Sequence, residues 1–129
     1  MIVDSSAVIA ILRNEPERDE FAAALLDNPA RMSVANWLEA AMVADGSTDR
    51  QAARTFDRIV EVSGIEVVSL TPEHARAARI AFRRYGRGSG SPARLNFGDC
   101  FAYALSATSG EPLLFKGEDF IHTDVLRAG

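Results

Sequence analysis

Short apolar runs alternate with longer segments of helical periodicity along the whole chain. The apolar runs have the length and the flanking turn residues of buried strands. They predict strands at Ile2–Val3, Arg31–Val34, Ile65–Leu70 and Pro112–Phe115, with a last short strand at Val125–Leu126. The segments between them predict helices at Ala7–Leu12, Glu17–Leu26, Asn36–Ala44, Pro72–Tyr85 and Phe97–Thr108, and a further helix that ends at Val62. This alternation predicts an α/β fold with a central parallel sheet and helices on both faces.

Side chains that cap helix ends support these boundaries. Ser, Thr and Asn accept hydrogen bonds from the first free N–H groups of a helix. The predicted caps are Ser5 or Ser6, Ser47 or Thr48, Thr71 and Asn96. Pro72 strengthens the start after Thr71, and Gly110 is a suitable end for the last helix. Residues 86–93 are the only low-complexity segment and predict a mobile loop.

The composition narrows the class of protein without identifying its chemistry. The 129 residues are 47% hydrophobic and 25% charged, which is typical of one globular domain spanning residues 1–129. These values exclude a disordered chain and a collagen-like fibre, and a single cysteine, Cys100, excludes a disulfide scaffold. Asp4 interrupts any apolar leader, and no run is long enough for a membrane span, so we expect a cytoplasmic protein.

Basic residues are concentrated in one part of a chain whose net charge is −4. No acidic residue lies between Glu73 and Asp99, whereas six arginines do: Arg76, Arg79, Arg83, Arg84, Arg87 and Arg94. The first three follow one another at three and four residues and therefore form one stripe on the predicted helix. Arginine binds phosphate oxygens well, so Arg76, Arg79, Arg83 and Arg87 are candidate contacts for the phosphates of a nucleic acid such as RNA. The alternative is an ordinary solvated helix face followed by a loop.

Three acidic residues are the only charges in otherwise apolar segments. Asp4 is the only charge in residues 1–12, Glu39 in residues 32–44, and Asp99 in residues 95–110. Burying an unpaired carboxylate costs several kcal/mol unless a cation, hydrogen-bond donors or a proton compensates. None of the three segments contains a basic partner of its own.

The predicted topology brings these acids toward a common rim. Asp4 ends the first strand, Asp99 lies in the first turn of its helix, and Glu118 and Asp119 follow the strand at Pro112–Phe115. The carboxyl ends of parallel strands and the amino ends of the following helices share one edge, where ligands bind. An all-oxygen site of this kind suits Mg²⁺ or Mn²⁺, and such ions assist phosphodiester hydrolysis.

Each acid also has a purely structural interpretation. Asp99 complements the helix dipole in a first turn, and Asp4 is a suitable cap or turn residue. In this interpretation Glu39 lies on a solvent-exposed face of its helix, and Asp119 is a solvated residue in a polar turn. The coincidence of lone charges with one rim favours the functional interpretation.

Four sequence motifs, in this order, resemble those of PIN-domain ribonucleases of the VapC toxin type. They are Ile2-Val3-Asp4-Ser5-Ser6-Ala7, Trp37-Leu38-Glu39, Asn96-Phe97-Gly98-Asp99-Cys100 and Leu114-Phe115-Lys116-Gly117-Glu118-Asp119-Phe120. The resemblance implies that Asp4, Glu39, Asp99 and Asp119 line one metal site. It also implies Mg²⁺- or Mn²⁺-dependent cleavage of RNA, often tRNA, which restrains translation and growth. A homodimer and a VapB-like antitoxin are implied as partners.

One departure from the family pattern affects the fourth acid. Many relatives carry a Thr-x-Asp motif directly after the last core strand, whereas this chain has Lys116-Gly117 there. We assign Asp119 because it precedes Phe120 as in the family, and Glu118 remains the alternative. Ser6 and Asn96 are candidate donors that orient Asp4 and Asp99, although both also suit ordinary helix caps.

Two other functions are consistent with acids at this rim. A phosphatase of the haloacid dehalogenase type has Asp-x-Asp after its first strand, whereas Ser5-Ser6 follow Asp4 here. A phospho-receiver has paired acids near its start, which this chain lacks. A non-catalytic RNA- or partner-binding domain of the same fold is the alternative from another class, and it gives no reason for buried carboxylates.

Overall fold

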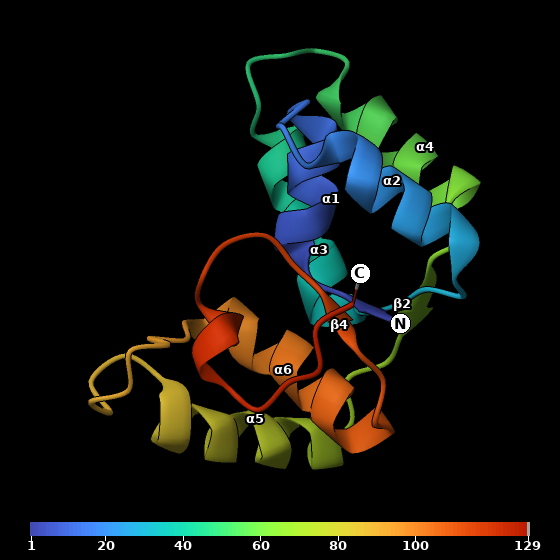
Figure 1. Ribbon diagram of the computed structural model, residues 1–129. Helices are drawn as coiled ribbons and strands as arrows, with labels where there is room; N and C mark the ends of the chain where they lie inside the picture. The colour runs from blue at the N-terminus through green and yellow to red at the C-terminus, as the bar shows by residue number, and fades with distance from the viewer. Residues whose placement is uncertain (129) are drawn as a thin grey trace.

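The computed structural model describes residues 1–128, so Gly129, the last residue of the predicted domain, lies outside the described residues. Four short strands and six α-helices alternate as the sequence predicts, followed by a 3₁₀ turn, η1 (Figure 1). The strands are β1 (Ile2–Val3), β2 (Arg31–Ser33), β3 (Glu66–Val68) and β4 (Leu113–Leu114). The helices are α1 (Ser5–Leu12), α2 (Arg18–Asp27), α3 (Val34–Asp45), α4 (Ala52–Val62), α5 (Pro72–Tyr85) and α6 (Phe97–Ser109), and η1 spans Phe120–His122.

All strand pairs in the sheet are parallel. The order is β3-β2-β1-β4, so the first strand lies in the interior between the second and the last. Both faces of β1 are buried, which explains its unbroken apolar sequence. The predicted parallel sheet is therefore confirmed, and its carboxyl edge lies beside Asp4.

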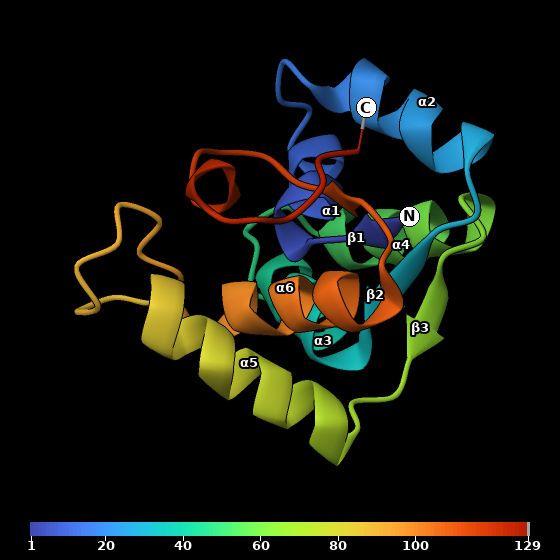
Figure 2. The same cartoon turned by 60° about the horizontal axis from the view of Figure 1, so that its bottom comes forward.

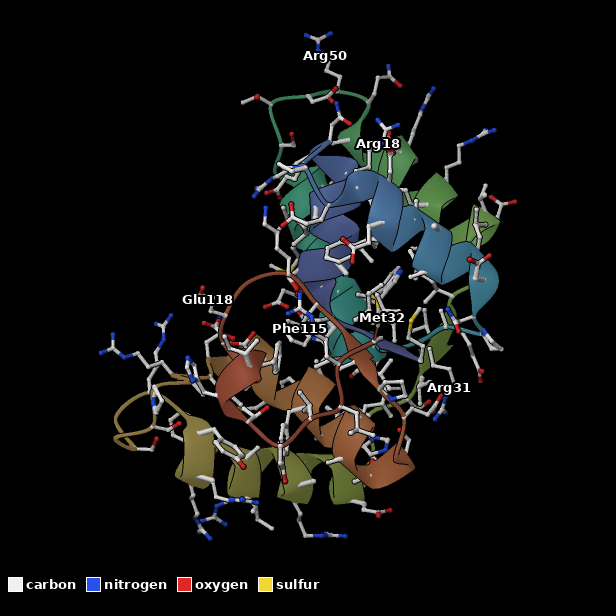
Figure 3. All side chains as sticks on the ribbon, in the orientation of Figure 1. Arg18, Arg31, Met32, Arg50, Phe115 and Glu118 are labelled. Carbon is white, nitrogen blue, oxygen red and sulfur yellow. The ribbon has the colours of Figure 1, made fainter. Side chains whose placement is uncertain are left out.

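Alternate strand residues face two separate cores. Val3 and Leu114 pack with α1, α2, α3 and α4, whereas Ile2 and Leu113 pack with α5 and α6. Figure 2 shows α5 and α6 side by side on one face and α1, α2 and α4 on the other. In Figure 3, Met32 and Phe115 point into the middle of the molecule, and both are buried. Within residues 1–128, no helix is long and apolar enough to cross a bilayer.

Two helix starts differ from the prediction because side chains bond elsewhere. Asp4, rather than Ser5 or Ser6, caps α1, and its carboxylate accepts a hydrogen bond from the N–H of Ser6. The helix predicted after Ser47 or Thr48 begins only at Ala52. The Ser47 hydroxyl accepts a hydrogen bond from the N–H of Asp49. The Asp49 carboxylate in turn accepts one from the N–H of Gln51. These local bonds offer the backbone a turn in place of a helix.

The end of the chain pairs more sparsely than predicted. In place of a strand at Val125–Leu126, one isolated parallel bridge joins Leu113 to Arg127. The segment is also held by Asp124, which accepts a hydrogen bond from the Tyr103 hydroxyl on α6 and faces Arg84 on α5.

Candidate metal site and its basic rim

Asp4 is a buried carboxylate with one free oxygen. It is only 2% exposed at the end of β1. One oxygen, Oδ2, accepts the N–H of Ser6 at 3.0 Å, while Oδ1 is buried and has no hydrogen-bond partner among residues 1–128. Burial raises the pKa of Asp4 to about 6 against the opposing hydrogen bonds of Ser6, and the charge of Glu39 adds to the rise.

Asp99 forms a reciprocal cap with Asn96 at the start of α6. The N–H of Asp99 donates to Asn96 Oδ1 at 2.9 Å, and the N–H of Asn96 donates to Asp99 Oδ2 at 3.0 Å. Burial raises the pKa of Asp99 to about 7, and the charges of Asp4, Asp119 and Glu39 contribute to the rise. Asn96 therefore orients Asp99, and the four predicted acids lie within electrostatic reach of one another.

Glu39 is held by three different helices. Its Oε1 accepts a hydrogen bond from the hydroxyl of Ser5 on α1 and lies 3.5 Å from Asn36 Nδ2 on α3. On α6, a Cβ at Gly98 would overlap the Glu39 carboxylate, so only glycine leaves room for it. Asn36 is fully buried and also donates to the Gly98 carbonyl at 2.9 Å. These contacts fix the carboxylate between α1, α3 and α6.

The two acids that follow β4 are exposed, and they differ in their surroundings. Asp119 precedes η1, where Phe120 is buried against Phe115 with ring centroids 5.1 Å apart. This packing anchors the backbone beside Asp119. Asp119 is among the charges that raise the pKa of Asp99, which favours it over Glu118 as the fourth acid. Figure 3 shows Glu118 on the outside of the loop after β4.

Ser6 connects this loop to the start of α1. Its hydroxyl accepts the N–H of Lys116 at 3.0 Å, and its own N–H binds Asp4. The Lys116 ammonium pairs with Glu15 and lies 3.5 Å from Glu17 on the turn before α2. Lys116 thereby ties the loop that follows β4 to the start of α1 through its backbone and to the turn between α1 and α2 through its side chain.

The arginines of the basic segment separate into two groups. Arg76, Arg79 and Arg83 lie exposed on α5, and Arg79 lines an apolar hollow with Phe82 and Phe97. Arg87 and Arg94 belong to the loop between α5 and α6. Together with Asp119 and the glycine-rich backbone, they line a cavity of about 850 Å³. The structure thus brings Arg87, but not the α5 stripe, into a common cavity with Asp119.

The donor set fits a hard divalent cation. Within residues 1–128, no three His, Cys, Asp or Glu side chains already stand close enough together to hold a metal ion. The charges of neighbouring acids nevertheless help to raise the pKa of Asp4 and of Asp99, and Asp4 Oδ1 is a buried oxygen without a donor. A divalent cation would satisfy this oxygen and relieve the repulsion, and an all-oxygen donor set favours Mg²⁺ or Mn²⁺.

Four residues in this region were missed by the sequence interpretation: Ser5, Asn36, Gly98 and Arg94. The first three act through contacts between segments that are 34 or more residues apart. The signal available for Asn36 was an uncharged amide in an apolar helix, which is weak. Arg94 carried no signal that separated it from the neighbouring arginines.

Comparison with known proteins identifies similar sequences over nearly the whole chain. The sequence model of the PIN domain matches residues 1–126. Ribonuclease VapC28 of Mycobacterium tuberculosis is 48% identical over 129 residues, covering 99% of this chain and 97% of its own. Ribonuclease VapC of Mycolicibacterium smegmatis is 44% identical over 126 residues, covering 97% of both chains.

A solved structure shows the same fold at much lower sequence similarity. The crystal structure of Mycobacterium tuberculosis VapC20, a toxin that cleaves the sarcin–ricin loop, superposes with a TM-score of 0.76. The match covers 98% of this chain and 97% of VapC20 at 14% identity. At that identity the match supports the fold alone.

Proposed function

The chain belongs to the PIN-domain family, in its VapC group, and from this premise we propose that it is a metal-dependent endoribonuclease. The observation that carries the proposal is the carboxylate cluster of the buried Asp4 with the half-buried Glu39 and Asp99, which the exposed Asp119 adjoins; neighbouring acids of this cluster help to raise the pKa of Asp4 and of Asp99. Relatives that are 44–48% identical are named ribonucleases. A non-catalytic binding domain has no use for such a cluster, whose charges oppose folding.

We assign a role to each acid in cleavage of the RNA backbone. Asp4, Asp99 and Asp119 would hold Mg²⁺ or Mn²⁺, directly or through water, and Glu39 would hold the ion or position the attacking water. When bound, the ion supplies positive charge that neutralises the phosphodiester and lowers the pKa of a water molecule.

The surrounding residues keep these acids in place. Ser6 and Asn96 orient Asp4 and Asp99 through backbone and side-chain hydrogen bonds, and Ser5 holds Glu39. Arg76, Arg79, Arg83 and Arg87 would contact the phosphates of the RNA. Such contacts give affinity and orientation without reading the sequence.

We propose that the protein is the toxin of a toxin–antitoxin pair, with a VapB-like antitoxin as its partner. In this proposal its target is RNA, with tRNA as a candidate, cleavage restrains translation and growth, and the protein acts in the cytoplasm. A hollow of about 260 Å³ between α1, α2 and α4 is a candidate site for an antitoxin helix; Ile11, Leu26, Ile59 and Val62 line it. The exposed apolar side chains of Leu38 and Met42 on α3 are consistent with a homodimer.

The test is cleavage of total cellular RNA by the purified protein. We expect discrete fragments with Mn²⁺ or Mg²⁺, none with EDTA, and at least a hundredfold loss of rate for Asp4→Asn and for Asp99→Asn. Circular dichroism spectra and thermal melts should show that both variants fold. Cleavage at the normal rate by either variant would refute the site assignment. Intact RNA in every condition would favour a binding role.

A further inference from the structure

The loop between α5 and α6 forms one wall of the cavity that reaches Asp119. Arg87 and Arg94 line this cavity together with Gly88, Gly90, Ser91 and Pro92. Figures 1 and 2 both place this loop and η1, the turn after Asp119, on the same side of the molecule. At about 850 Å³, the cavity has room for a nucleotide as well as its phosphate.

Hydrogen bonds hold both ends of this loop, although its composition predicted mobility. Gly86 and Leu95 form a parallel bridge, and the N–H of Arg87 donates to the Leu95 carbonyl at 3.2 Å. The Ser89 hydroxyl donates to the Gly86 carbonyl at 2.6 Å. Leu95 is fully buried in the core. The backbone that carries Arg87 and Arg94 is therefore fixed beside the cavity that Asp119 also lines.

Arg94 adopts a backbone conformation that is unfavourable for its side chain. Its φ is +52°, in the left-handed region that glycine adopts freely and that a long L side chain rarely adopts. Strained residues of this kind persist where the surrounding structure imposes them and are concentrated at functional sites. Buried packing does not explain an arginine here, because the Arg94 side chain is exposed.

The guanidiniums of Arg87 and Arg94 are both available for a ligand. Within residues 1–128, neither makes an ion pair or a side-chain hydrogen bond, whereas Arg31 and Arg84 pair with Glu111 and Asp124. Apart from Asp119, the residues that line the cavity carry no negative charge. The cavity therefore joins a basic wall to one member of the carboxylate cluster.

We propose that Arg94, together with Arg87, binds a backbone phosphate of the RNA strand adjacent to the bond that is cleaved. This assignment rests on the proposed ribonuclease function and adds a substrate-binding residue to it. The planar guanidinium matches the oxygens of a phosphate, and the fixed loop holds it at the edge of the carboxylate cluster. Placing an arginine side chain at this point of the loop requires the unfavourable left-handed backbone conformation of Arg94.

The proposal predicts that Arg94 can be replaced without harm to the fold but not without harm to cleavage. Asn and Gly tolerate the left-handed region, so Arg94→Asn and Arg94→Gly should melt at or near the wild-type temperature. Loss of a charged phosphate contact should lower kcat/KM on total RNA roughly ten- to hundredfold. Arg50→Ala is the matched control, since Arg50 lies at the opposite end of the molecule (Figure 3).

Binding is measured separately from cleavage, in the Asp99→Asn background with a short fluorescein-labelled single-stranded RNA. Removing one phosphate contact should weaken binding at every sequence tested and should reduce the slope of log affinity against log salt by about 0.7. The Arg50→Ala variant should keep the full slope.

Each result decides the assignment. Wild-type kcat/KM and an unchanged salt slope in Arg94→Asn would overturn it, as would a large loss of thermal stability in both Arg94 variants. If the wild type itself cleaves no RNA, the ribonuclease proposal fails first. The salt slope then still reports whether Arg94 contacts phosphate.

Discussion

The carboxylates of Asp4 and Asp99 bind a proton at higher pH in the folded protein than in the unfolded chain. Their ordinary pKa of 3.8 rises to about 6 and about 7, chiefly because burial disfavours the charged form. Between these values the folded state binds more protons than the unfolded state. The free energy of unfolding of the metal-free protein therefore falls as the pH rises from about 4 to about 7 because of these two groups.

This shift predicts that Asp99→Asn stabilises the metal-free protein at pH 8. Asparagine removes the buried charge and keeps an oxygen that accepts the N–H of Asn96. In EDTA, the variant should melt above the wild type at about pH 8, and the difference should vanish toward about pH 4. Each unit of pKa shift corresponds to about 1.4 kcal/mol. Thermal melts across this pH range measure the difference.

Thermal melts of the wild type and of Asp99→Asn with added Mn²⁺ are the complementary control. Added Mn²⁺ should raise the melting temperature of the wild type and leave that of Asp99→Asn nearly unchanged. If the variant is less stable than the wild type in EDTA at pH 8, Asp99 is a structural cap and the pKa argument fails.

At the scale of elements, Glu39 connects α3 to α1 and α6. Because a Cβ at residue 98 would overlap the Glu39 carboxylate, Gly98→Ala should displace that side chain or separate α3 from α6. Because the overlapping carboxylate ends a flexible side chain, it can move aside but gives up its hydrogen bond with Ser5, so we expect a loss of about 1 kcal/mol in the free energy of unfolding and a marked loss of RNA cleavage. Urea denaturation and the cleavage assay measure the two effects.

A double-mutant cycle separates this contact from general overpacking. In a Glu39→Ala background the clash is absent, so adding Gly98→Ala should cost far less stability than it does alone. Equal costs in both backgrounds would show that Gly98 matters for another reason.

Elements were predictable where their signals were local. Thr71 and Pro72 start α5, Asn96 caps α6, and Gly110 ends α6 in the left-handed conformation. The predicted start of α4 was wrong because Ser47 can either cap a helix or stabilise a turn, and in the structure it stabilises a turn. The turn is held by local hydrogen bonds of Ser47 and Asp49, and the identity of a possible cap residue does not by itself decide between the two uses.

The candidate site was predictable only in part. Three lone charges identified Asp4, Glu39 and Asp99 as the acids to examine. The side chains that hold them come from other segments: Ser5 reaches Glu39 across 34 residues, and Asn36 reaches Gly98 across 62. Periodicity and spacing within one segment contain no information about contacts at this range.

For the whole molecule, the surface proposed for the antitoxin lies apart from the surface proposed for RNA. The hollow between α1, α2 and α4 is separate from the cavity lined by Arg87, Arg94 and Asp119. Leu26 and Val62 line this hollow and are 67% and 61% exposed. Apolar side chains so exposed suit an amphipathic helix of an antitoxin.

This separation predicts variants that cleave RNA but escape the antitoxin. Leu26→Asp should fold and cleave as the wild type does, because its side chain is largely in solvent. Its inhibition by the VapB-like antitoxin should require at least tenfold more antitoxin. Leu126→Asp, at 65% exposure, is the matched control. Normal inhibition of Leu26→Asp would rule out this hollow as the antitoxin site.

The position of β1 in the sheet determines when the fold can be completed. The first strand pairs with β2 on one side and with Leu113 and Leu114 on the other, so one of its two neighbours is synthesised about a hundred residues after it. During synthesis Asp4 precedes Asp119 by more than a hundred residues. A nascent chain that stops short of β4 therefore lacks the β1–β4 pair and the loop that carries Asp119. The four candidate acids can assemble only after the segment that follows β4 has left the ribosome.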